Sequence, residues 1–65
     1  MFIIVERETI DDQSDRVSVF EAEMIGDEMV RHNERSWTEP TSAEEDAIAR
    51  RKRAIEKWQA LLGQR

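Results

Sequence analysis

The 65-residue sequence has no cysteine and no tyrosine, and it has only one histidine, His32. Without cysteine a small fold has neither a disulfide nor a thiolate metal ligand to brace it, and the absence of cysteine is common in the reducing cytosol. Covalent catalysis needs a nucleophile activated by a neighbouring base, and His32 is the only imidazole available. We therefore expect a protein that is not an enzyme and binds no cofactor.

Long apolar runs are also absent. The longest is Met1–Val5, which has no preceding Lys or Arg and no small-residue cleavage site, so a signal peptide is not expected. A membrane span would need roughly 18 apolar residues. Asp11, Gln13 and Asp15 have the spacing of the first half of a calcium loop, but the glycine and the closing glutamate are missing. We expect a soluble, cytoplasmic protein without membrane contact or bound metal.

Apolar residues are scarce for a folded domain. They make up 38% of the chain, whereas typical domains contain roughly 45–50% with glycine counted. A chain of this length is one domain at most (residues 1–65), and it buries only about 60% of the surface exposed by its unfolded form. A second copy or a larger protein partner would complete such a core, so we expect a homodimer or a constitutive complex.

Charge is unevenly distributed along the chain, whose formal net charge is −5. Residues 1–40 contain eleven acidic residues and four arginines, whereas residues 41–65 contain four acidic and six basic residues. An acidic chain is poorly suited to nonspecific nucleic-acid binding, because phosphate contacts require a surplus of Lys and Arg. A protein partner is therefore expected in preference to a nucleic acid.

Alternation and turn residues predict an α+β fold, a three-stranded antiparallel meander covered by one long C-terminal helix. Strands are expected at 2–8, 16–25 and 28–33, and a polar connector containing Trp37 at 33–40. The helix is expected at 42–62, beginning after Pro40 at a capping box and ending at Gly63.

The segment 18–33 allows two interpretations. Gly26-Asp27 suits a two-residue hairpin turn, which would place Met24 opposite Met29 and Glu21 opposite His32. The alternative is a helix begun by the capping box Ser18-x-x-Glu21, which would give one strand followed by two helices. The β-branched start of the segment and its central glycine favour the hairpin.

The expected helix carries an apolar stripe that should cover the sheet. Its members are Ala47, Ile48, Ala54, Ile55, Trp58, Leu61 and Leu62. Arg51 lies at the centre of the stripe. Either its aliphatic stem lies across the sheet and its charge reaches the edge, or it forms an ion pair inside a dimer or partner interface.

These features favour a small, acidic, non-catalytic interaction protein that docks on a larger macromolecule. Its size and charge are those of phage-type accessory proteins that inhibit a host enzyme or defence complex, although no motif is shared. Glutamates that imitate phosphates would be one way to occupy a nucleic-acid site on such a target. The expected partner-binding residues are Glu21, Glu23, Glu28, Trp37 and Arg51.

A second hypothesis is a small dimeric nucleic-acid-binding regulator. It would use one basic flank of the C-terminal helix, formed by Arg50, Arg53 and Lys57. The four-residue run from Arg50 to Arg53 disperses around the helix, which weakens this interpretation.

Overall fold

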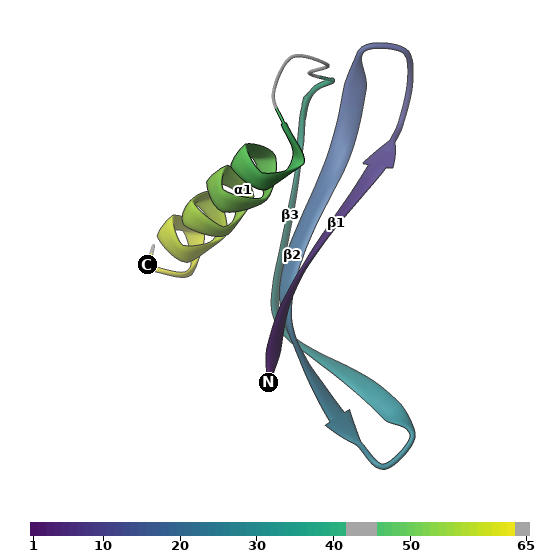
Figure 1. Ribbon diagram of the computed structural model, residues 1–65, viewed down its shortest axis with the longest axis vertical. Helices are drawn as coiled ribbons and strands as arrows, with labels where there is room; N and C mark the ends of the chain where they lie inside the picture. Colours follow the sequence, from purple (N-terminus) through teal and green to yellow (C-terminus); the bar gives the residue numbers. More distant parts are fainter. Residues whose placement is uncertain (42–45, 64–65) are drawn as a thin grey trace.

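The computed structural model describes residues 1–41 and 46–63 and has four elements. The strands are β1 (Phe2–Thr9), β2 (Ser14–Ile25) and β3 (Glu28–Pro40), and the helix is α1 (Ala47–Leu62). The strands form an open antiparallel sheet in the order β1-β2-β3, and α1 lies across one face of it (Figure 1). The predicted α+β meander with a C-terminal helix is confirmed.

The segment 18–33 is not a helix but lies in the β2–β3 hairpin. Gly26 has φ +63°, a left-handed conformation that glycine adopts without steric cost. Met24 pairs with Met29 and Glu21 with His32. The predicted register is therefore confirmed, and the alternative of two helices is wrong.

The third strand is longer than predicted. β3 continues from Glu28 to Pro40, so the segment 33–40 is not a connector. Trp37 pairs with Val17, and Ser36 pairs with Ser18 and shares a 2.9 Å hydrogen bond with its hydroxyl. The segment looked like a loop because one face of this antiparallel sheet is open to solvent, where strand residues can be polar.

A β-bulge interrupts the β2–β3 ladder and helps to seat the helix. The register shifts between the pairs Val19–Arg35 and Glu21–His32, where β3 has one more residue than β2. Asn33, in the extra stretch, has φ +56°, a conformation that Asn tolerates better than most residues. The indole Nε1 of Trp58 donates a 2.7 Å hydrogen bond to the Asn33 carbonyl oxygen.

The core between sheet and helix is small. Val17 and Val19 of β2 pack against Ala54 and Trp58 of α1, all at most 3% exposed. Partly buried residues surround them, namely Val5, Trp37, Ile55 and Leu62. We call this side of the sheet the helix face and the other side the open face.

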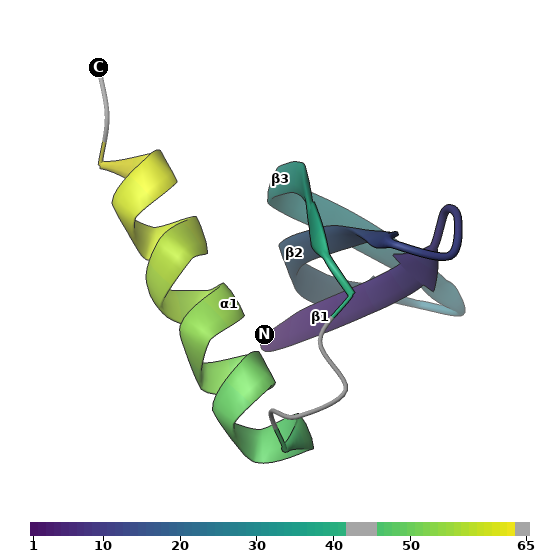
Figure 2. The same ribbon diagram turned by 90° about the horizontal axis from the view of Figure 1, so that it is seen from above.

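The first half of the predicted apolar stripe is not in the core. Ala47 is exposed and the side chain of Ile48 is 83% exposed. In Figure 2 the first turns of α1 extend past the β1 edge of the sheet, so no strand lies under them. Asp46 caps the helix by accepting a 2.7 Å hydrogen bond from the Ala49 amide. The predicted helix start at Ser42 falls in 42–45, outside the described residues.

The molecule is more extended than its size requires. Its radius of gyration is 12.8 Å, compared with about 11 Å for a compact domain of this length. Its accessible surface is 5044 Å², which is about 700 Å² more than the scaling law for monomeric proteins gives for this mass. The sheet end that projects beyond the helix accounts for the elongation (Figure 1).

Candidate interaction surface

The β2–β3 hairpin projects beyond the part of the sheet that the helix covers (Figure 1). We call residues 21–32 the hairpin arm; it begins after the bulge and ends at the Gly26-Asp27 turn. Side chains alternate between the two faces along each strand, and directly paired residues share a face. The register therefore assigns each arm residue to the helix face or to the open face.

Acidic residues occupy the helix face of the arm. Glu21 pairs with His32, Glu23 with Val30 and Glu28 with Ile25, and all six have the same facing. Glu23 Oε2 lies 2.9 Å from His32 Nε2. The structure thus brings the three glutamates predicted to bind a partner onto one face of one projecting hairpin.

Methionines occupy the opposite side of the arm, on the open face. Met24 and Met29 form a directly opposed pair, and their exposed fractions are 56% and 44%. Ile25, beside the turn but on the helix face, is 58% exposed. Exposed apolar side chains gathered at one place are typical of an interaction site, and flexible methionines suit adaptable contacts. The sequence pattern predicted the methionine pair but not its exposure.

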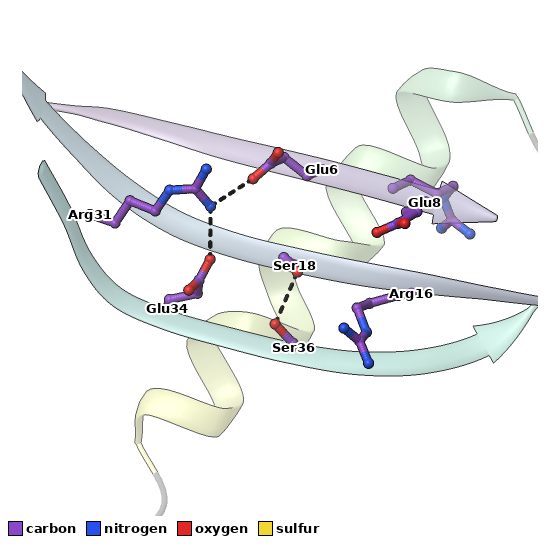
Figure 3. Close-up of a pocket in the computed structure, with 8 residues that line it drawn as sticks. Glu6, Glu8, Arg16, Ser18, Arg31, Glu34 and Ser36 are labelled. Carbon is purple, nitrogen blue, oxygen red and sulfur yellow. Dashed lines mark hydrogen bonds and ion pairs between the residues drawn. The ribbon is translucent and has the colours of Figure 1, made fainter. Parts of the chain in front are cut away.

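Arg31 joins the three strands on the open face (Figure 3). Its Nη1 lies 2.9 Å from a Glu6 carboxylate oxygen and 3.0 Å from one of Glu34. Its guanidinium carbon also lies 4.2 Å from the ring centre of Phe20. Phe20 is therefore buried on a face that no helix covers. The hydrogen bond to Glu34 and the charge of Glu6 raise the pKa of Arg31.

The residues around Arg31 form an open polar depression of about 380 Å³. Glu8, Arg16, Ser18 and Ser36 line its remaining part (Figure 3). The two serine hydroxyls hydrogen-bond to each other, and no imidazole lies in the lining to activate either of them. The depression offers paired charges and hydroxyls for polar contact.

Trp37 packs back on its own chain. Its Nε1 donates a 3.0 Å hydrogen bond to Glu39, and Lys57 Nζ lies 4.9 Å from the centre of its ring. The indole contacts the core as a half-buried strand residue. The partner-binding role predicted for Trp37 assumed that it lay in a polar connector, and its place on β3 removes that basis.

The basic flank of α1 faces the end of β3. Arg53 Nη2 lies 2.9 Å from Glu39 Oε1, and Lys57 covers the Trp37 ring. Arg50 lies one turn earlier and is half-buried. Arg53 and Lys57, both proposed for nucleic-acid binding, therefore contact side chains of the same sheet.

Glu39 belongs to a larger ionic network at this end of the sheet. Arg7 donates to Asp15, at 2.9 Å, and to Glu39. The hydrogen bonds from Arg7 and from the Thr41 hydroxyl hold the pKa of Asp15 below its ordinary value. Burial alone would raise the pKa of Glu39, but hydrogen bonds from Arg7 and Trp37 and the charge of Arg53 outweigh it and lower this pKa.

Arg51 extends along the sheet edge. Its Nη2 donates a 3.3 Å hydrogen bond to the Ile3 carbonyl oxygen, and the residue is exposed. This hydrogen bond ties α1 to β1 at the sheet edge.

Within residues 1–41 and 46–63, no three His, Asp or Glu side chains are placed to hold a metal ion. The helix described here is too short and too polar to cross a membrane. Comparison of the chain with protein-family models, curated proteins and solved structures found no match.

Proposed function

We propose that this protein is a small, non-catalytic interaction protein that docks on a larger protein through its hairpin arm. The observation that carries the proposal is the arm itself, which exposes Met24 and Met29 on its open face and carries Glu21, Glu23 and Glu28 on its helix face. Exposed apolar side chains are typical of docking surfaces, and acidic charge on the other side of the same hairpin selects a basic partner.

The more specific form of the proposal is inhibition. A projecting acidic hairpin can enter a groove lined by Lys and Arg, and a groove of that kind on a host enzyme or defence complex is where nucleic acid binds. In this form the glutamates take the place of phosphates, as expected of a phage-type accessory inhibitor. Its specific consequence is that the protein and a nucleic acid compete for the same target.

The test is affinity capture from a lysate of the native host, using the wild-type chain and two arm variants. One variant neutralises the acidic face (Glu21→Gln, Glu23→Gln, Glu28→Gln) and the other removes the apolar pair (Met24→Ser, Met29→Ser). The matched control removes three acids from the other end of the sheet (Glu8→Gln, Asp11→Asn, Asp12→Asn), so its net charge equals that of the first variant.

We expect wild type and control to retain one stoichiometric partner and both arm variants to lose it. Retention should weaken as salt increases, because the glutamates act through screened charge. Retention that is the same for all four chains, or no partner at all, would exclude docking by the arm. If the captured partner binds nucleic acid, adding that nucleic acid should release the protein. If the protein stays bound, phosphate mimicry is excluded, but docking by the arm is not.

The proposal does not extend to nucleic-acid binding by the basic flank. Arg53 and Lys57 contact Glu39 and Trp37, so a phosphate would have to displace these intramolecular contacts. A flat mobility-shift titration at low salt is the expected result for the isolated chain.

A further inference from the structure

A second exposed apolar surface lies where β1 meets the first half of α1. Ile48 on the helix is 83% exposed, and Ile3, which lies on the helix face of the strand, is 37% exposed. The 3.3 Å hydrogen bond from Arg51 to the Ile3 carbonyl oxygen ties the two elements together. This surface is separate from the methionines of the hairpin arm.

β1 is an edge strand whose outward backbone groups can be identified. The Ile10 amide donates to the Ser14 carbonyl at 2.9 Å, continuing the β1–β2 ladder in which even-numbered residues of β1 face β2. Odd-numbered residues, including Ile3 and Val5, therefore direct their N–H and C=O groups outward. Arg51 confirms this direction, since it reaches the Ile3 carbonyl from outside the ladder. Unpaired groups on an apolar edge are a template for another strand.

We propose that this surface binds a second copy of the same chain, with the two β1 strands antiparallel across a two-fold axis. Pairing Ile4 with Ile4 of the second copy aligns Ile3 with its Val5. The outward groups of both residues then form ladder hydrogen bonds, and the Ile3 carbonyl oxygen has a second lone pair for Arg51. The result is a six-stranded sheet with both helices on one face.

Charge complementarity selects a second copy as the occupant. Next to Ile48 and Ile55, the exposed face of α1 carries Lys52 and Glu56, one turn apart. A two-fold axis makes every contact twice, so two antiparallel helices can place Lys52 of each copy against Glu56 of the other.

This inference does not depend on the proposed function, because its variants leave the hairpin arm intact. The measurement is the sedimentation-equilibrium mass of the full chain over a wide concentration series. We expect reversible dimers for wild type. Ile48→Lys, which places a charge in the seam, should raise the dissociation constant about 30-fold or more.

Charge reversal tests the proposed contact between Lys52 and Glu56 of the two helices separately from the apolar contacts of Ile48. Lys52→Glu and Glu56→Lys should each weaken the dimer roughly tenfold, since each replaces two attractive pairs with two repulsive ones. The double variant should regain the wild-type mass because the pairs are restored with opposite sign. Met24→Ser with Met29→Ser should leave the dimer unchanged, and circular dichroism should show every variant folded.

A wild-type chain that stays monomeric at all concentrations would overturn the inference. So would dimers that tolerate Ile48→Lys, or single charge reversals that the double variant does not rescue. The methionine variant separates the two proposals. If it loses the host partner but still dimerises, that result supports docking by the arm and leaves the dimer inference unaffected.

Discussion

At the scale of single residues, an ionic network at one end of the sheet links all three strands and the helix. Arg7 of β1 bonds to Asp15 of β2 and to Glu39 of β3, and Arg53 of α1 contacts the same Glu39. Both carboxyl groups have pKa values below their ordinary values. A carboxyl group whose pKa is lower in the folded chain stabilises the fold while it is ionised in both states.

This network predicts acid sensitivity. The contribution is complete above the ordinary carboxyl pKa values, near 4, and is lost as the pH falls through the lowered values of the folded chain. The urea midpoint should therefore decrease with acidification below about pH 4.5. Asp15→Asn with Glu39→Gln should lower the midpoint at neutral pH and flatten its decrease in acid. If the urea midpoint of the variant decreases just as steeply in acid, groups other than Asp15 and Glu39 cause the acid sensitivity.

A single indole fixes the position of the helix on the sheet. The Trp58 Nε1 hydrogen bond to Asn33 is 2.7 Å long, and Trp58 is 2% exposed. Trp58→Phe should lower the free energy of unfolding by about 2 kcal/mol, because it leaves the bulge carbonyl without its donor and removes buried volume. Trp37→Phe is the control: its half-buried Glu39 partner retains other donors, so the cost should be under about 1 kcal/mol. If urea titrations show the same decrease in the free energy of unfolding for Trp58→Phe and Trp37→Phe, the hydrogen bond to the bulge has no special role.

At the scale of elements, the hairpin turn determines where the arm ends. Gly26 has φ +63°, and a Cβ added there would meet nothing within 4 Å. Gly26→Ala should therefore cost about 1 kcal/mol through backbone conformation alone. Gly63→Ala is the matched control, since Gly63 has φ −78° and its added Cβ would lie at ordinary contact distance. Thermal unfolding should show a lower midpoint for the first variant and little change for the second.

Local chemistry was sufficient to predict the element order and the hairpin register. Alternation from Val17 to Met24 followed by glycine predicts a strand and a turn, and the pairing of Met24 with Met29 follows by counting. The extent of β3 could not be predicted in this way. Polar residues such as Ser36 and Glu34 belong to the strand because one face of the sheet is open, which is a tertiary property.

The candidate site could be predicted only where it follows from the hairpin register. Glu21, Glu23 and Glu28 could be placed near one another from the hairpin register, and the structure brings them to one face. The exposure of Met24 and Ile48 could not be predicted, because it depends on where the helix stops covering the sheet. The ionic partner of Arg53 could not be predicted either, since β3 had been expected to end before Glu39.

At the scale of the whole molecule, shape and surface both indicate incomplete burial. Six apolar residues of the described ranges 1–41 and 46–63 are at most 3% exposed, while Met24, Ile25, Met29 and Ile48 are among the large apolar residues that stay exposed. With no disulfide to compensate, this chain should gain stability from association by mass action. Its midpoint of thermal unfolding should rise with protein concentration, and Ile48→Lys should move that rise to concentrations about 30-fold higher or more. A concentration-independent midpoint for wild type would contradict association.

The central claim is that the hairpin arm is what the target touches, and methyl NMR of the three methionines tests it most directly. Met24 and Met29 lie on the arm, and Met1 lies at the start of the chain. On addition of the purified target to methyl-labelled protein, we predict that the signals of Met24 and Met29 shift or broaden more than that of Met1, which lies near Glu21 at the base of the arm. A bound complex in which only Met1 shifts, or none of the three, would contradict the account.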